Sequence, residues 1–250
     1  MKQKMKHLQS LVAVALCIIF AMSFISCSKD DEPEKPKVEK RMTSLDDISF
    51  VYSDDGKISQ QIEYGEPYYN FKYTSSSIIR TSKYNSTTTF TLKDGLITSF
   101  TNSDLGDDDY EITYENGRIK SWKGYSDGEI GHEVEYEWKD GVIVRQIKYS
   151  YYDSEKELHC DYQYSYTSDL DYGGAVACFQ SNSLLYDYLP EALVIQGYFG
   201  KLPKYLVASA IDASPNGFSP DYYTWTLDSD GYAIRVSDDY NVYFTWENLK

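Results

Sequence analysis

Residues Ile112–Ile119 read ITYENGRI, and this pattern decides the fold. Apolar and polar residues alternate on both sides of an Asn-Gly pair, as they do in strands with one buried face. Asn-Gly between two such runs is the strongest short-range signal for a β-hairpin, because a type I′ turn needs positive φ at both central residues. The stretch therefore predicts two antiparallel strands joined by a two-residue turn.

The same unit recurs along the chain, with a turn glycine roughly every 20 residues. A divergent copy, FKYTSSSII at 71–79, lacks the glycine. The clear copies are ISFVYSDDGKI at 48–58, FTLKDGLI at 90–97, VEYEWKDGVI at 134–143 and YTWTLDSDGYAI at 223–234. Hairpins in series, without a helical period, predict an antiparallel meander.

Each hairpin separates an apolar face from a polar one. A regular turn at 116–117 places Ile112, Tyr114 and Ile119 on one face. The same construction around 140–141 places Val134, Trp138, Ile143 and Ile147 on the apolar face and Glu133, Glu135 and Glu137 on the opposite face. One face of the meander therefore belongs to a core and the other to water.

A meander with one apolar face buries it by curling or by packing under another element. The stretch 182–211 offers a cover, because apolar residues recur there at helical spacing. We therefore predict an all-β fold, an antiparallel meander of β-hairpins curled into a barrel-like or half-barrel sheet, with a short helical insertion near 182–211. Residues 45–250 form a single antiparallel β domain. A transmembrane barrel is disfavoured, because its strands need about 9 to 11 residues.

Residues 1–26 have the architecture of a lipoprotein signal peptide. Met1–Lys6 carries three lysines and no acid, Leu8–Phe24 is nearly all apolar, and Ser26 precedes Cys27. Cleavage before Cys27 would leave this cysteine as an acylated N-terminus. An ordinary signal peptide and an uncleaved anchor are the alternatives, but the apolar run is short for a spanning helix of about 20 residues.

The residues after the cysteine are Ser28, Lys29, Asp30, Asp31 and Glu32. They resemble the acidic export signal of surface-exposed Bacteroidota lipoproteins, and a solvated acidic linker is the alternative reading. Residues 27–44 hold two prolines among charged residues, which predicts an acylated cysteine followed by a flexible acidic tether. The resemblance implies an outer-membrane lipoprotein exposed at the cell surface.

The charge of the chain limits its partners. It holds 24 Lys and Arg against 39 Asp and Glu, a net charge of −15 that becomes more negative when the signal leaves. Nucleic acid and anionic headgroups repel such a body. We therefore expect no nucleic-acid partner and a membrane contact only through the N-terminal lipid. A glycan or an extracellular protein remains open as a partner.

Cys160 and Cys178 remain once Cys17 leaves with the signal and Cys27 is acylated. In an exported protein they can form a disulfide, which the chain-entropy model values at about 3 kcal/mol. Two buried thiols on different strands are the alternative, because sequence spacing does not determine the geometry of the pair.

The mature sequence lacks the common catalytic and metal-binding patterns. His132 and His159 are its histidines, and it has no Gly-x-Ser-x-Gly elbow, His-Glu-x-x-His helix or phosphate loop. The acidic run Asp104–Asp109 does not match EF-hand spacing. We therefore assign no catalytic residue, metal or cofactor. A glycan-active hydrolase stays open, because it needs only two carboxylates and the chain has many.

Aromatic residues are the main lead to a ligand, with 26 tyrosines among 250 residues. Cross-strand pairing accounts for most of them. Regular hairpin registers pair Phe100 with Thr89 on the polar face. They also pair Trp122 with Glu111 there. We therefore hypothesise a binding surface around Phe100 and Trp122, with Tyr125 beside them, which a β-bulge that buries Trp122 would refute.

Several motifs resemble a family of Bacteroidota lipoproteins whose domain of unknown function is described as porin-like. They are the lipobox with its acidic signal, the Tyr-x-x-x-Gly-x-Ile hairpins, the segment Gly197–Pro203, and the closing hairpin with Gly231 and Tyr243–Trp246. The resemblance covers about residues 45–250 and implies a curved antiparallel sheet without catalytic residues. The hairpins are also similar to YD repeats, which keep stricter Tyr-Asp and Gly-Arg pairs.

The sequence thus predicts a lipid-anchored cell-surface protein. Its predicted role is a non-catalytic module that binds a glycan or a protein, or a structural module. The alternative is a glycan-active hydrolase with an unidentified carboxylate pair.

Overall fold

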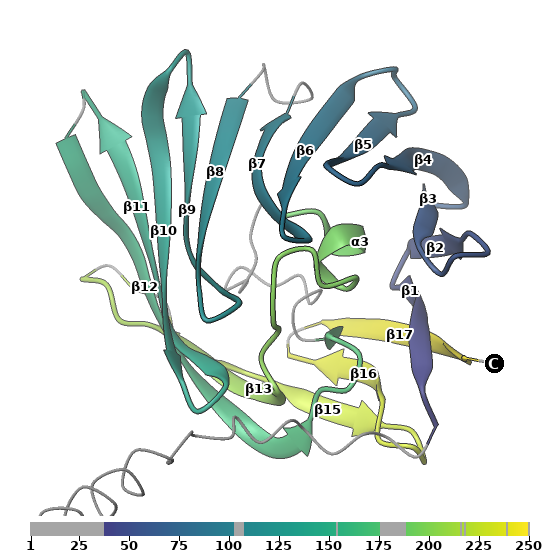
Figure 1. Cartoon of the computed structure of the whole chain (residues 1–250). Coiled ribbons are helices and arrows are strands. Elements are labelled where there is room, and N and C mark those ends of the chain that lie inside the picture. Colours follow the sequence, from purple (N-terminus) through teal and green to yellow (C-terminus); the bar gives the residue numbers. More distant parts are fainter. Residues whose placement is uncertain are drawn as a thin grey trace, which may run out of the picture. The chain divides into compact units, whose positions relative to one another are not determined.

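The chain folds into a curved antiparallel sheet around one short helix (Figure 1). The computed structural model describes residues 38–102, 108–153, 155–175, 189–215, 217, 219–238 and 240–249. Within these residues the sheet has 17 strands, and the helix is α3 (Glu191–Val194). None of the helices described there is long and apolar enough to cross a membrane. The predicted all-β, barrel-like meander is confirmed.

The strands lie side by side in chain order and nearly close into a barrel. Successive strands pair antiparallel, β14 and β15 are separated only by Tyr223, and β1 pairs with both β2 and β17. The strands are β1 (Lys40–Leu45), β2 (Ile48–Tyr52), β3 (Ile58–Glu63), β4 (Glu66–Tyr73), β5 (Ser77–Ser82), β6 (Thr87–Lys93), β7 (Leu96–Asn102), β8 (Asp108–Glu115), β9 (Arg118–Ser126), β10 (Glu129–Lys139), β11 (Val142–Tyr152), β12 (Glu155–Leu170), β13 (Tyr205–Asp212), β14 (Asp221–Tyr222), β15 (Thr224–Leu227), β16 (Ala233–Ser237) and β17 (Asn241–Asn248).

Strand β1 differs from the predicted domain boundary. Residues Lys40–Ser44, which the sequence assigned to the tether, belong to this strand. Met42 and Leu45 of β1 are each 2 % exposed. The strand that follows the tether therefore joins the two ends of the meander and contributes to the core.

The hairpin turns have the predicted geometry. Residues 94–95, 116–117 and 140–141 all have positive φ, between 50° and 82°. The flanking residues pair directly, as in Glu115 opposite Arg118, so each loop has two residues. Positive φ at both positions is the type I′ requirement that Asn-Gly and Asp-Gly meet with little strain.

The pairing beyond the turns departs from the regular register. A β-bulge adds one residue to the second strand, directly after the apolar residue that follows the turn. Because side chains alternate, one extra residue turns the rest of the strand to the opposite face. The extra residues are Ser59, Thr98, Lys120, Val144 and Ile234, with Thr43 in β1 and Ala208 in β13 equivalent to them.

The bulge in β11 makes one predicted side-chain orientation wrong. Ile147 was expected beside Trp138 on the apolar face, but it pairs with Glu135 and lies on the outer face. Val134, Trp138 and Ile143 belong to the core side as predicted. The physical reason is the extra Val144, which reverses the alternation between Ile143 and Ile147.

Each carbonyl directly before one of these seven extra residues, although not before those of the bulges described at the other end of the hairpins, accepts a hydrogen bond from an aromatic side chain of a neighbouring strand. We call these acceptors the bulge carbonyls. A bulge disrupts the ladder locally, so a side-chain donor can supply a partner there. The bonds are 2.5–2.7 Å long and run from Tyr52 to Met42, Tyr73 to Ile58, Tyr114 to Ile97, Trp138 to Ile119, Tyr166 to Ile143, Trp225 to Val207 and Trp246 to Ala233.

Leu92 supports this reading of the bulges. It pairs with Ile97, just as Tyr114 pairs with Ile119, so it occupies the place of an aromatic donor. The strand behind it, β5, pairs with β4 without a bulge. Leucine, which cannot donate, therefore stands where the neighbouring strand presents no bulge carbonyl.

The segment 195–204 crosses the turn end of these hairpins, next to α3. Tyr198 O accepts from Ile97 N at 2.9 Å, and Lys201 N donates to Gly117 O at 2.8 Å. Gly200 has φ +88°, and a Cβ there would lie 2.6 Å from Gly117 O, so only glycine fits. Strand β13 follows from Tyr205, so the helical insertion ends earlier than the predicted 211.

The inner face of the sheet and this insertion share one core. Leu193, Val194 and Phe199 are completely buried against the inward side chains of the strands. The opposite face is polar, as β6 illustrates with exposed Thr87, Thr89 and Thr91 between buried Thr88 and Phe90. The meander therefore buries its apolar face both by curling and by accepting a cover.

We predict that Tyr114→Phe lowers the free energy of unfolding by about 1–3 kcal/mol, because it leaves the buried Ile97 carbonyl without its donor. Tyr125→Phe is the matched control, since it removes the same atom from the outer face and should change stability by less than about 0.5 kcal/mol. Urea unfolding measures both. Equal losses in the two variants would contradict a special role for the bulge carbonyls.

Candidate functional site

The structure refutes the predicted surface around Phe100 and Trp122. Phe100 is 4 % and Trp122 is 1 % exposed. The bulges at Thr98 and Lys120 pair Phe100 with Phe90 and Trp122 with Ile112, not with the polar residues of a regular register. Both rings therefore belong to the core.

These rings form part of a longer aromatic row on the inner face. Ring centroids are 5.0 Å apart for Phe90 and Phe100, 4.5 Å for Phe100 and Tyr110, and 5.9 Å for Tyr110 and Trp122. Trp122 Nε1 also donates to the hydroxyl of Tyr136 at 3.3 Å. The row crosses the inner face from β6 to β10 as packing, because aromatic pairs at these separations are stabilising.

Tyr125 lies apart from the other two predicted residues. It is half-buried on β9, pairs with Asp109, and donates its hydroxyl to Glu111 Oε2 at 3.1 Å. Burial and the Glu111 carboxylate raise the pKa of this hydroxyl. Because Trp122 points inward, Tyr125 and Trp122 cannot form one patch.

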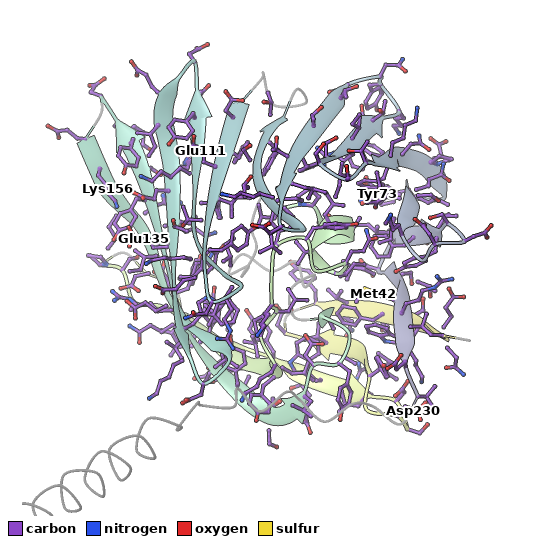
Figure 2. All side chains as sticks on the ribbon, viewed as in Figure 1. Met42, Tyr73, Glu111, Glu135, Lys156 and Asp230 are labelled. Atoms are coloured by element: carbon purple, nitrogen blue, oxygen red, sulfur yellow. The ribbon has the colours of Figure 1, made fainter. Side chains whose placement is uncertain are left out.

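A charged network occupies the outer face of β9–β12. Figure 2 shows Glu135 and Lys156 on the side of these strands turned away from α3. Glu133, only 7 % exposed, accepts from Lys156 at 2.7 Å, Tyr151 at 2.8 Å and Lys123 at 3.3 Å. Burial opposes ionisation of Glu133, but these three donors outweigh it and lower its pKa. The predicted outer position of the glutamates agrees with this arrangement.

Exposed tyrosines gather at the end of the sheet opposite segment 195–204. Tyr64, in the β3–β4 turn, is 83 % exposed, and Tyr84, in the β5–β6 turn, is 71 % exposed. The half-buried Tyr68 has its ring centroid 6.1 Å from that of Tyr84 and 4.7 Å from that of the half-buried Tyr69. We call Tyr64, Tyr68, Tyr69 and Tyr84 the tyrosine rim. It presents aromatic surface to solvent, which core packing does not explain.

Two cations hold the rings of the tyrosine rim. Lys83 Nζ lies 4.7 Å from the ring centroid of Tyr68 and 5.3 Å from that of Tyr84. The Arg80 guanidinium lies 4.3 Å from the ring centroid of Tyr69 and 5.8 Å from that of Phe90. Arg80 thus links the half-buried Tyr69 of the rim to Phe90 of the buried aromatic row, which gives that end of the rim a rigid base.

Polar side chains lie on the inner face directly behind the rim. Gln61 pairs with Tyr69 and is 3 % exposed, and its Nε2 donates to Glu63 Oε1 at 2.9 Å. Burial raises the pKa of Glu63, and the charge of Glu191 on α3 raises it further, against the effects of Gln61, Lys83 and Arg80. A carboxyl with a raised pKa beside a second carboxylate is typical of functional sites.

The backbone of Tyr64 is a further sign of function. Its φ is +51°, a left-handed conformation that bulky residues adopt at a cost of about 1–2 kcal/mol. Asp or Asn occupies the other non-glycine positions with positive φ among the described residues. A tyrosine at this position therefore lowers the stability of the folded protein. Strained residues of this kind cluster at binding and catalytic sites.

Sequence reasoning missed the tyrosine rim because it treated most tyrosines as cross-strand partners. The available signals were Tyr64-Gly65 and Tyr84-Asn85, which place an aromatic ring in a turn where Asn or Asp is expected. The closeness of Tyr84 to Tyr68 depends on the pairing of β4 with β5, beyond which Lys83 N donates to Tyr68 O at 2.8 Å.

Other predicted residues stay predictions. Cys27, the acidic residues 28–32 and Cys178 lie outside the described residues. Cys160 is buried on β12, but its predicted partner Cys178 lies outside the described residues, so the disulfide stays a prediction. Among the described residues, no group of three or more His, Cys, Asp or Glu is arranged to hold a metal ion.

Comparison with known proteins shows the fold. No protein-family model matches the chain, and no curated protein matches it. The crystal structure of a porin-like protein from Bacteroides uniformis is similar with a TM-score of 0.60 and 15 % identity, covering 80 % of this chain and 90 % of that one. A porin-like protein from Bacteroides vulgatus is similar with a TM-score of 0.59 and 15 % identity, covering 84 % of this chain and 100 % of that one. The chain therefore has a porin-like fold.

The network around Glu133 makes stability depend on pH. Its folded-state pKa is lowered, so the network stabilises the fold above the ordinary carboxyl pKa of about 4.3 and the effect is lost as pH falls through the lowered value. We predict that Glu133→Gln flattens the fall in unfolding free energy between about pH 5 and 3. Urea unfolding across pH measures it, with the exposed Glu129→Gln as control. Parallel profiles for Glu133→Gln and the parent chain would contradict the prediction.

Proposed function

We propose that this protein is a lipid-anchored module at the outer cell surface that binds a glycan or an extracellular protein through the tyrosine rim. The signal-like residues 1–26, Cys27 and the acidic run after it support the anchor and the export. An acyl anchor places the sheet in water, and the polar outer face described above fits that surrounding.

The observation that carries the binding role is the strained, 83 % exposed Tyr64. Exposed tyrosines offer a large contact area at small entropic cost, and they recur at binding hot spots. The cations Lys83 and Arg80 hold neighbouring rings in place, so little freedom is lost on binding.

A glycan-active hydrolase is the second candidate. Glu63 and Glu191 supply two carboxylates, and the raised pKa of Glu63 suits a general acid. Chromatography of glycans incubated with the protein tests this candidate, because only hydrolysis produces shorter chains. Binding without shorter products supports the non-catalytic role.

The anchor has its own test. We predict that Cys27→Ala moves the protein out of the membrane fraction, because the thioether-linked chains cannot form. Cys17→Ala, within the signal, should leave the protein in the membrane fraction. Protease added to intact cells should cut the anchored protein. Cleavage only after lysis would contradict surface exposure, and an unchanged membrane fraction for Cys27→Ala would contradict the lipid anchor.

Tyr64→Asn separates a binding role from a structural one. We predict that it raises the unfolding free energy by about 1 kcal/mol, because Asn tolerates the left-handed backbone, and weakens ligand binding about tenfold. Arrays of glycans and extracellular proteins, with thermal unfolding in parallel, measure both effects. Tyr240→Ala is the control, because Tyr240 is 79 % exposed in a different hairpin. Equal binding by the parent chain and Tyr64→Asn would contradict the role of the rim.

A further inference from the structure

Tyr64 differs from the other rings of the tyrosine rim in its partners. Lys83 lies over the rings of Tyr68 and Tyr84, and Arg80 lies over the ring of Tyr69. Over the part of the chain that the structure describes, no Lys or Arg lies over the ring of Tyr64, although this ring is the most exposed of the four. Tyr64 therefore presents its ring faces to a cation from another molecule.

Two exposed carboxylates lie beside Tyr64. They belong to Asp46 and Asp47, which form the β1–β2 turn. Tyr64 N donates to Asp47 O at 3.1 Å, so the backbones of the two turns are in direct contact. Among the described residues, neither carboxylate has a hydrogen bond or an ion pair. Two neighbouring negative charges thus stand next to an exposed aromatic ring without a cation of the chain to offset them.

The protein itself shows what such a set of groups binds. In the β15–β16 turn, the carboxylates of Asp228 and Asp230 lie 2.7 and 2.6 Å from Lys40 Nζ. The same Nζ lies 5.3 Å from the ring centroid of Tyr232, which follows these acids in the chain. Two turn aspartates and one tyrosine therefore bind a lysine together.

A second set in the protein has the same composition. Lys156 Nζ lies 3.7 Å from the ring centroid of Tyr149 and pairs with Glu133 at 2.7 Å and Glu135 at 3.1 Å. An ammonium is attracted both by the face of a ring and by carboxylates, and the two attractions act together. Asp46, Asp47 and Tyr64 thus repeat a cation-binding combination that the chain does not complete from its own residues.

A polypeptide suits this place better than other cations. Lys and Arg carry an apolar stem that can cover an aromatic ring while the charged head reaches carboxylates beyond it. An amino sugar holds its ammonium directly on the ring and has no such stem. The net charge of −15 also attracts a basic protein from a distance.

We infer that the tyrosine rim binds a basic segment of an extracellular protein. One Lys or Arg side chain of this partner lies on the ring of Tyr64 and pairs with Asp46 and Asp47. This inference rests on the proposed binding function and adds the class of partner.

Calorimetric titration of the full chain tests the inference with hexalysine and hexaarginine. A Gly-Ser hexapeptide, hexaglutamate and a chitosan hexamer are the comparison probes. We expect at least one basic peptide to bind, and all three comparison probes to bind at least tenfold more weakly. Salt should weaken the binding, because the groups involved are exposed.

A pair of double variants separates this site from general attraction to an acidic protein. Asp46→Asn with Asp47→Asn should weaken binding of the basic peptide about tenfold. Asp127→Asn with Asp153→Asn removes the same charge from two other turns and should change the affinity less than about twofold. Residues 46, 127 and 153 have φ between 48° and 52°, which Asn tolerates as Asp does, so both variants should fold. Thermal unfolding checks this.

Each further outcome decides against part of the inference. Equal losses in the two double variants overturn it, because the attraction then depends on net charge alone, and so does the absence of binding of both basic peptides at millimolar concentration. Tightest binding of chitosan, lost in the Asp46 and Asp47 variant, overturns the partner class and leaves the binding function intact. Peptide binding that Tyr64→Asn leaves unchanged overturns the inference, and unchanged binding on the glycan and protein arrays as well overturns the proposed function.

Discussion

The hydrogen bonds from aromatic side chains to the bulge carbonyls are the interaction on which the rest of the structure depends. Each bulge adds a residue and increases the local twist, which bends the sheet. Tyr114 and Trp138, among others, then bond the carbonyls that the bulges leave at the inner face. Such a bond to a buried acceptor is stabilising by about 1 kcal/mol. Repeated from hairpin to hairpin, the pair of bulge and donor makes a meander that curves until β1 meets β17.

The same bulges decide which aromatic rings face a ligand. Phe100 and Trp122 turn inward and become packing. Tyr68 is instead the extra residue of a bulge between β3 and β4, and its ring contacts that of exposed Tyr84. At the rim the aromatic row leaves the core and reaches solvent through Tyr69, Tyr68 and Tyr84. Core and candidate site are therefore two ends of one stacked arrangement, and the buried end gives the exposed end its rigidity.

Charged groups on the outer and inner faces of the sheet differ in the same way as the aromatic rings do. On the outer face, Glu133 and Lys156 pair within a network that spans several strands, which suits a sheet surrounded by water. On the inner face, Glu63 keeps a raised pKa because it is buried near Glu191. The first arrangement is an ion-pair network in which the charge of the carboxylate is favoured, and the second holds a carboxyl group whose charge is disfavoured. This difference separates a structural network from a candidate binding site.

The sequence by itself determined the all-β meander, because Asn-Gly and Asp-Gly turns such as 116–117 encode local conformation and alternation encodes a buried face. It also determined the signal-like N-terminus, which depends on contiguous residues. It did not determine which side chains face inward, since extra residues such as Lys120 and Val144 share no type and a bulge depends on the neighbouring strand. Only the tertiary structure brought Lys83 onto the ring of Tyr68 and Glu191 close to Glu63, because that proximity requires strand pairing and an insertion from distant sequence.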